Sequence, residues 1–208
     1  MATDPSSPPH YEPKPRWAHC GALVEGKLIT YGGHFGADGG VADPPTSVDI
    51  FDPNSESWEL ISSSGAPPSG VCNAACITIG NFLYHICGVD GNQHYNTIHC
   101  LDTRTKIWTE LRPANPEAAP TPKACVRIIL HGSNLITFGG YGPLPTNHYP
   151  GVQYIPHPDP ELKGRGWTNE VVCYDTEQSE CVCHQLYMYY MNIFKIINYH
   201  FLVFNNNV

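Results

Sequence analysis

Two large aromatic residues stand at the ends of the longest loop that the sequence predicts. Tyr141 follows a glycine pair, Trp167 comes shortly before a predicted strand, and six prolines lie between them. Core packing explains such aromatics less readily than ligand contact does, and long loops inside a compact repeat often carry function. Arg165 adds a cationic donor for a carboxylate or phosphate, although many loop arginines are only solvated. These residue types indicate binding chemistry.

The residues of enzymes and metal sites form no complete pattern in this sequence. It contains no Gly-x-Ser-x-Gly motif, phosphate-binding loop or other nucleophile signature. Cys181-x-Cys183-His184 resembles part of a zinc site, but no second ligand pair with suitable spacing follows it. The 11 histidines share no spacing that would bring them together. We therefore expect a binding protein that is not an enzyme and holds no metal ion or cofactor.

Three similar stretches, which recur about every fifty residues, organise most of the chain. In each stretch an apolar hairpin ends in glycine, a loop follows, and a strand closes on an aspartate. Six residues after the aspartate comes a tryptophan, which a cysteine replaces in the third stretch. The three stretches are Leu28–Gly33 with Asp52 and Trp58, Phe82–Gly88 with Asp102 and Trp108, and Leu135–Gly140 with Asp175 and Cys181.

This period predicts an all-β fold, an incomplete β-propeller of about three four-stranded blades. The expected blades cover residues 16–65, 66–118 and 119–181, after a flexible proline-rich arm at 1–15. Propellers usually close with about four to eight blades, so three blades would leave strand edges open.

Residues 182–208 form an atypical tail, because they contain no glycine, proline or acidic residue. The apolar stretch 186–204 is long enough for a membrane span, but Lys195 in its middle would be costly in lipid. We expect no membrane segment, and we interpret the tail as sequence translated from outside the native exon or reading frame.

Charge and cysteine content restrict the partners and the compartment. The formal net charge is −8 and no basic stripe is present, which disfavours nucleic-acid binding. The nine cysteines are an odd number, and the sequence has no signal peptide. We expect reduced thiols in the cytoplasm or nucleus, packed as small apolar residues in the strands. They include Cys72, Cys76, Cys87, Cys100, Cys125 and Cys173.

The repeats resemble those of the kelch family. This resemblance rests on Arg16-x-x-His19, the glycine-ended hairpins and the aspartate-to-tryptophan spacing. The third repeat is similar in particular to kelch domain-containing proteins 1 and 2. That similarity rests on 138–145 (Phe-Gly-Gly-Tyr-Gly-Pro-Leu-Pro), Arg165-Gly-Trp167 and 171–176, and the likeness covers about residues 16–181 but not the tail.

The resemblance implies a function and a site. Those relatives are six-bladed substrate receptors of a cullin-RING E3 ubiquitin ligase, and they bind the C-terminal carboxylate of proteins that end in Gly-Gly. Lys123, Tyr141 and Trp167 fall on positions that line this degron pocket. His34 stands where the relatives have a tyrosine after the glycine pair. The carboxylate-holding residues and the elongin-binding box of the relatives follow the third blade, so the elongin/cullin adaptor is expected only for a full-length form.

Two alternatives stay open. Lys123 follows a proline just as Arg16 does, which also suits a packing role at a repeated position. The whole chain could instead be a general kelch scaffold that binds actin, a transcription factor or a trafficking protein through its rim. A pocket for a peptide end needs cationic donors and flat aromatic walls. A general scaffold has no such requirement.

Overall fold

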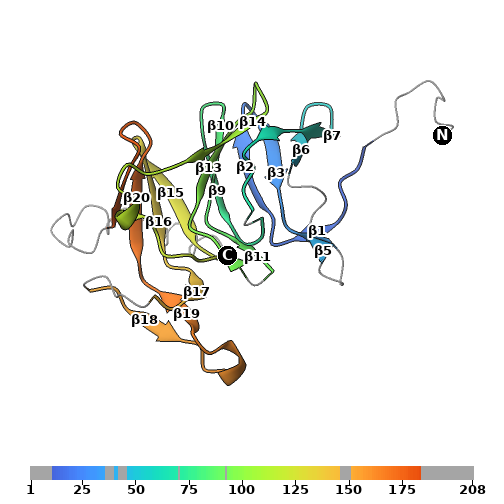
Figure 1. The fold of residues 1–208 in the computed structure, drawn as a ribbon. Coiled ribbons are helices and arrows are strands. Elements are labelled where there is room, and N and C mark those ends of the chain that lie inside the picture. Colours follow the sequence, from blue (N-terminus) through green and yellow to red (C-terminus); the bar gives the residue numbers. More distant parts are fainter. Residues whose placement is uncertain are drawn as a thin grey trace, which may run out of the picture.

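In a computed structural model the regular secondary structure of the described residues is almost entirely β-strand (Figure 1). The structure describes residues 11–35, 40–41, 46–69, 71–91, 93–145 and 151–183, so most of the predicted arm and tail lie outside the described residues. The helices in these ranges are two single 3-10 turns, η1 (Pro116–Ala118) and η2 (Pro160–Leu162). Neither turn, and no other described segment, is a helix long and apolar enough to cross a membrane.

Three antiparallel sheets with one common plan form the body of the molecule. In each sheet a tight hairpin pairs with a third strand, which pairs with a fourth. The prediction of an all-β fold with about three four-stranded sheets is confirmed. The first sheet contains β2 (Cys20–Val24), β3 (Lys27–Tyr31), β6 (Ser47–Asp52) and β7 (Ser57–Ser62). The second contains β9 (Ala75–Ile79), β10 (Phe82–Ile86), β13 (Ile98–Asp102) and β14 (Ile107–Leu111). The third contains β15 (Arg127–His131), β16 (Asn134–Phe138), β20 (Val171–Asp175) and β21 (Glu180–Cys183).

An aspartate ends the third strand of every sheet and shapes the turn that follows. One carboxylate oxygen of Asp52, Asp102 and Asp175 accepts the backbone N–H two residues further on, at 2.9, 2.9 and 2.8 Å. Such side-chain contacts favour a turn over continued strand. Each turn also contains one residue with left-handed backbone, which is Glu56, Lys106 or Ser179. The repeated aspartate is therefore a turn residue in this fold.

Backbone hydrogen bonds join the beginnings of the three sheets. Ala18, Asn73 and Cys125 occupy the same place before their hairpins, and all three have left-handed backbone with φ of 58°, 52° and 59°. The Asn73 N–H donates to the Ala18 carbonyl at 2.8 Å, and the Cys125 N–H donates to the Asn73 carbonyl at 2.7 Å. These bonds fix each sheet against the one before it.

The linkers between the repeats bind to the outer strand of the following sheet. After the first sheet, β8 (Ser64–Gly65) pairs in parallel with β14. After the second, the Asn115 side chain accepts the Cys181 N–H at 2.8 Å and donates to the Cys181 carbonyl. Each linker therefore covers part of an edge that would otherwise expose unpaired backbone groups.

Apolar clusters fill the spaces between neighbouring sheets. Between the first and second sheets, Trp108 is 1% exposed, lies 4.9 Å from the Tyr31 ring and donates from its indole to Ser63 at 3.1 Å. Between the second and third sheets, the buried Cys181 takes the place of this tryptophan. Trp58 is only partly buried and packs on Phe51. The residue six positions after the aspartate thus seals the second and third sheets against the preceding one.

One cysteine pair departs from the prediction of reduced thiols. Cys20 of β2 and Cys76 of β9 form a disulfide between the first and second sheets, so the expectation of a free thiol at Cys76 is wrong for this structure. The opening strands of adjacent sheets run next to each other, which brings the two Cα atoms to 5.7 Å across 56 residues of sequence. The free cysteines among the described side chains are Cys72, Cys87, Cys100, Cys125, Cys173 and Cys181.

Three small sheets lie together at one end of the body, at the bottom of Figure 1. Each contains the segment that follows a glycine-ended hairpin. The first contains β1 (Arg16–Trp17), β4 (His34–Phe35) and β5 (Gly40–Val41), and the second contains β11 (Val89–Asp90) and β12 (Gln93–His94). The third contains β17 (Tyr141–Pro143), β18 (Tyr154–Pro156) and β19 (Arg165–Thr168). Every predicted site residue except Lys123 lies on one of these small sheets.

Candidate functional site

The third small sheet is formed by a sharp exit of the chain from its hairpin. Gly140 has φ of +113°, and a Cβ atom there would lie 2.9 Å from the Lys123 side chain and 3.0 Å from the Ala124 carbonyl. Only glycine fits both the left-handed backbone and this close approach. The chain then turns directly into β17, so that Tyr141 becomes its first residue.

Tyr141 and Trp167 come together in this sheet. They are directly opposite each other in the pairing of β17 with β19, and their ring centroids are 5.3 Å apart. Trp167 is 42% exposed, whereas Tyr141 is partly buried. The two ends of the predicted long loop therefore meet, and one large apolar ring stays open to solvent.

Two histidines complete an aromatic cluster, which we define as His94, Tyr141, His157 and Trp167. His157 stacks on Trp167 at 5.1 Å and lies 5.9 Å from Tyr141. His94 of β12 is 5% exposed and lies 6.1 Å from the Tyr141 ring. The cluster thus joins the second and third small sheets.

The two histidines were missed by sequence reasoning. His157 lies inside the long loop that the sequence had singled out, so its position was a usable signal. His94 comes from the previous repeat, 47 positions before Tyr141, and nothing in its local sequence distinguishes it from the other histidines.

The Tyr141 hydroxyl is a polar group held inside this cluster. Its oxygen is buried and has no hydrogen-bond partner among the described residues. Buried polar groups in proteins are normally hydrogen-bonded. A polar ligand atom that reached this hydroxyl would therefore gain a bond without displacing a protein partner.

Arg165 lies on the same face of the small sheet as the two aromatic residues. Residues two apart in a strand share a face, and Arg165 is two positions before Trp167 and directly opposite Pro143. The side chain is partly buried, and its backbone carbonyl accepts the His157 N–H at 2.8 Å. The Arg165 side chain therefore leaves β19 on the same face of the sheet as Trp167.

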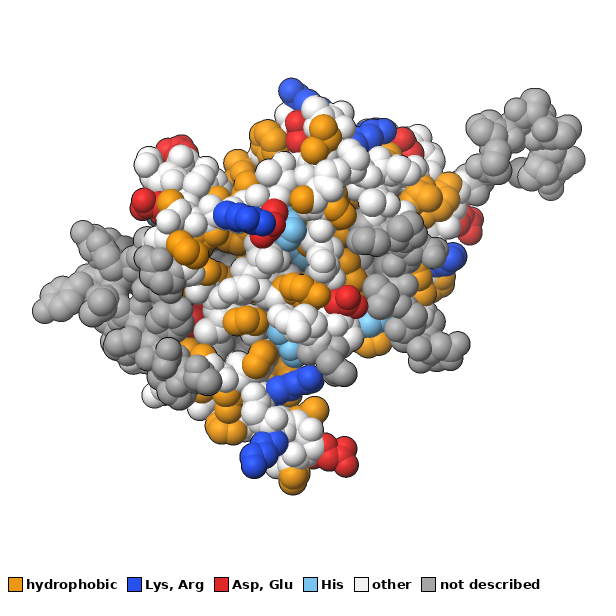
Figure 2. Space-filling model, viewed as in Figure 1, with side chains coloured by type: hydrophobic (Ala, Val, Ile, Leu, Met, Phe, Trp, Pro, Cys, Tyr) orange, Lys and Arg blue, Asp and Glu red, His pale blue; other side chains and the backbone are white. Residues whose placement is uncertain are grey.

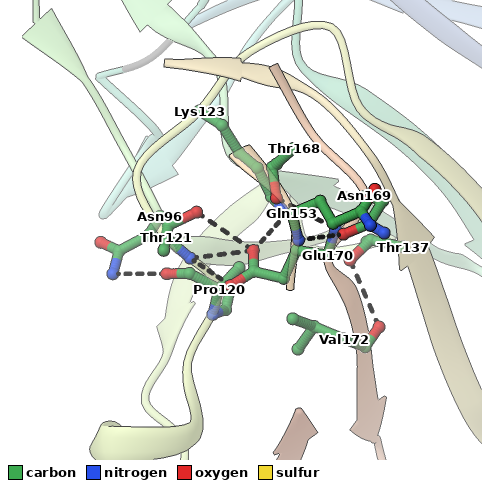
Figure 3. Close-up of polar contacts among 10 residues, drawn as sticks. All are labelled: Asn96, Pro120, Thr121, Lys123, Thr137, Gln153, Thr168, Asn169, Glu170 and Val172. Carbon is green, nitrogen blue, oxygen red and sulfur yellow. Dashed lines mark hydrogen bonds and ion pairs between the residues drawn. The ribbon is translucent and has the colours of Figure 1, made fainter. Parts of the chain in front are cut away.

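Lys123 is placed differently from the other predicted residues. It is 1% exposed, and its ammonium group forms an ion pair with Glu170, which is fully buried (Figure 3). Glu170 also accepts the backbone N–H and the hydroxyl of Thr121, at 3.2 and 3.1 Å. The structure therefore gives Lys123 an internal partner, which favours the packing alternative over ligand contact.

A similar ion pair occurs at the equivalent position of the first repeat. The Arg16 guanidinium lies 2.6 Å from a carboxylate oxygen of Asp49, which is 1% exposed, and Tyr11 donates to the same carboxylate. In both repeats a cationic side chain just before the hairpin pairs with an acidic side chain in or next to the third strand. The sequence had shown the repeated cation but not its acidic partner.

His34 lies on the first small sheet and outside the aromatic cluster. It is directly opposite Trp17 in the pairing of β1 with β4, and the two rings are 4.7 Å apart. Trp17 is 55% exposed. In the second repeat the position after the glycine is Val89, which pairs with His94. Each small sheet thus places a ring at the same end of the molecule, but only the second and third share one cluster.

The surface around these sheets is mixed in character. On the face drawn in Figure 2, apolar and histidine side chains are exposed between separated charged groups, and the Lys and Arg side chains do not gather in one basic patch. This face offers rings and scattered charges to a ligand.

Comparison with known proteins finds a family that matches this repeat region. Residues 3–140 match the family model described as the KLHDC2/KLHL20/DRC7 Kelch-repeats domain. The chain belongs to the kelch-repeat family. Kelch repeats of this kind form protein-binding modules, and the three four-stranded sheets described above are kelch blades.

Individual relatives are similar at modest identity. Kelch domain-containing protein 1 of Homo sapiens is 28% identical over 133 residues, which cover 61% of this chain and 32% of the relative. Acyl-CoA-binding domain-containing protein 4 of Arabidopsis thaliana is 28% identical over 120 residues, 56% of this chain and 17% of the relative. N-(sulfonatooxy)prop-2-enimidothioate sulfolyase of Thlaspi arvense is 25% identical over 134 residues, 62% of this chain and 36% of the relative. The kelch chain thus spans between about a sixth and just over a third of these relatives' length.

Proposed function

We propose that these kelch repeats bind the free C-terminal tail of partner proteins that end in Gly-Gly. The observation that carries the proposal is the aromatic cluster, with Arg165 beside it on the same face of β17 and β19. The cluster comes from loops at one end of neighbouring blades, where a ligand can contact several repeats at once.

The chemistry of such a tail fits this surface. A chain that ends in Gly-Gly offers one carboxylate, several backbone amides and no side chain at its last two positions. The exposed ring of Trp167, stacked on His157, gives a flat wall against which glycine backbone can lie. The guanidinium of Arg165 and the imidazole of His157 are suitable donors for a carboxylate.

The wider role follows from the family resemblance. In this proposal the chain is the tail-binding part of a substrate receptor for a cullin-RING E3 ubiquitin ligase, acting in the cytoplasm or nucleus. The elongin/cullin adaptor would bind a longer form of the protein. The role is non-catalytic, although one of the similar proteins is named as an enzyme.

A titration with peptides tests the tail-binding role on this chain. We expect a peptide ending in Gly-Gly with a free carboxylate to shift the indole N–H resonance of Trp167 in NMR spectra, and the amidated peptide to shift it far less. Because the site presents one wall and few cationic donors, we expect a Kd on the order of 1 mM, which corresponds to about −4 kcal/mol.

A matched pair of substitutions provides the control. With the backbone amide resonances of β17 and β19 as the readout, Trp167→Ala should abolish the difference between the two peptides. Trp17→Ala, which removes an exposed tryptophan from another small sheet, should preserve it. If the free acid and the amide bind equally well, the proposal fails. The general scaffold, which would bind actin, a transcription factor or a trafficking protein through its rim, then becomes the better explanation.

A further inference from the structure

A buried histidine in the middle of the first two blades has no polar partner. His85 of β10 is 0% exposed, and neither of its ring nitrogens has a hydrogen-bond partner among the described residues. An imidazole always carries a donor or an acceptor at each nitrogen. Two unsatisfied nitrogens in one buried ring are unusual enough to indicate a missing ligand or ion.

The kelch repeat itself does not require a histidine at this place. His85 is the second-last residue of β10, and the equivalent residues of β3 and β16 are Thr30 and Thr137. Thr137 satisfies its hydroxyl within the blade by donating to the Val172 carbonyl at 3.2 Å. His85 thus departs from the residue type of the other two blades, and its ring nitrogens form no hydrogen bond with the described residues.

Two sulfur atoms lie beside this histidine. Cys76 is directly opposite His85 in the pairing of β9 with β10, and Cys20 approaches from β2 of the first blade. One donor atom from each of the three residues lies within 4.8 Å of the other two. Cys20 is 6% exposed, whereas Cys76 is partly exposed, so the group can be reached from one side.

We propose that Cys20, Cys76 and His85 form a zinc site when the disulfide is reduced. Two thiolates, one imidazole and one open position are a set of protein ligands that Zn²⁺ uses in proteins. The fourth position would face the partly exposed side of Cys76 and take water or a ligand from solution. This proposal does not depend on the proposed binding of C-terminal tails.

The charges and distances suit this ion. Two thiolates neutralise one Zn²⁺, and a neutral group is far less costly to bury than a charged one. With Zn–S bonds of about 2.3 Å in a tetrahedron, the two sulfurs would stand about 3.8 Å apart. The donor atoms already lie within 4.8 Å of one another, which is close to the spacing of ligand atoms around a tetrahedral zinc ion.

Oxidation and zinc binding exclude each other at this site. A thiol reductant supplies two electrons and two protons to the disulfide, which gives two cysteine thiols and an oxidised reductant. Zinc binding then releases the two thiol protons. In the reverse direction, diamide takes two electrons from the two zinc-bound thiolates and two protons from water and becomes the corresponding hydrazine, while the cysteines form the disulfide and zinc leaves. The site therefore couples blade-to-blade cross-linking to metal occupancy.

Cobalt provides a spectroscopic probe of the full 208-residue chain. We expect the reduced protein to bind one Co²⁺ per chain, with the visible bands of tetrahedral cobalt and a thiolate charge-transfer band that Zn²⁺ removes. The oxidised protein should show neither band. Diamide added to the zinc-loaded protein should release one equivalent of Zn²⁺ to a chromogenic chelator.

Three variants separate the site from general cysteine chemistry. His85→Thr places the residue of the other blades at this position, and Cys20→Ser removes one sulfur. Both should weaken cobalt binding about 10-fold or more, while Cys173→Ser in the third blade should not. Circular dichroism confirms that each variant is folded, and the oxidised wild type serves as the unsubstituted control. Equal cobalt binding by the reduced and oxidised wild type, or by the reduced wild type and a folded His85→Thr variant, would overturn the proposal.

Discussion

The buried ion pair between Lys123 and Glu170 gives the sharpest test of how this site is built. The two side chains are 1% and 0% exposed, so water screens their attraction very little. Replacing Lys123 with Met would leave a buried carboxylate held only by Thr121. Removing one partner of a buried ion pair typically costs about 3–5 kcal/mol, a large share of a net stability of about 5–15 kcal/mol.

A double-mutant cycle measures this cost. We expect Lys123→Met to lower the free energy of unfolding by about 3–5 kcal/mol. Urea denaturation monitored by tryptophan fluorescence measures this change. The double variant Lys123→Met with Glu170→Leu should cost less than either single change, because no buried charge remains and only the Thr121 contacts are lost. Lys163→Met, at an exposed lysine, should change stability by less than about 0.5 kcal/mol.

One outcome would refute the reasoning. If Lys123→Met kept the stability of the wild type and instead abolished tail binding, the lysine would be a ligand residue and the ion pair would have no structural role. The prediction from family resemblance, which places Lys123 in the degron pocket, would then be preferred.

Three further outcomes follow from burial and geometry. Burial raises the pKa of the Cys87 thiol to about 12, so at pH 8 we expect iodoacetamide to label the exposed Cys125 of the folded protein well before Cys87, as measured by peptide mass spectrometry. Gly166→Ala would place a Cβ atom 2.2 Å from the Ile155 carbonyl oxygen and should speed hydrogen exchange in β18 and β19 while the three blades stay folded; unchanged exchange there would contradict it. Trp108→Ala should lower the free energy of unfolding by about 3–5 kcal/mol in urea denaturation, and a loss below about 1 kcal/mol would mean that the ring does not seal the first two blades.

Much of the blade structure could be predicted because its signals are local. The first hairpin, β2 with β3, can be read from the sequence because the turn at Glu25-Gly26 separates two apolar runs. The third hairpin is harder to read. The polar run 131–134 suggests a four-residue turn, but His131 and Asn134 pair with each other and the turn is only Gly132-Ser133.

The candidate site was predictable only in part because its contacts are not local. Tyr141 and Trp167 could be chosen as neighbours of a long loop, but β17 to β19 are too short to show periodicity, so their pairing was not visible. Lys123 and Glu170 are 47 residues apart, and no pattern in either segment predicts the ion pair. Cys20 and Cys76 meet only because adjacent blades place their first strands side by side.

The linkers that bind to the outer strands have a consequence for solubility. The second and third sheets each have their last strand partly shielded by the segment that enters from the preceding repeat, through β8 and Asn115. No described segment pairs with the outer side of β7. A row of free amide and carbonyl groups there is a template for adding another strand, so concentrated solutions of this chain should self-associate edge to edge at 57–62, and a charged or proline substitution in that strand should keep them monomeric.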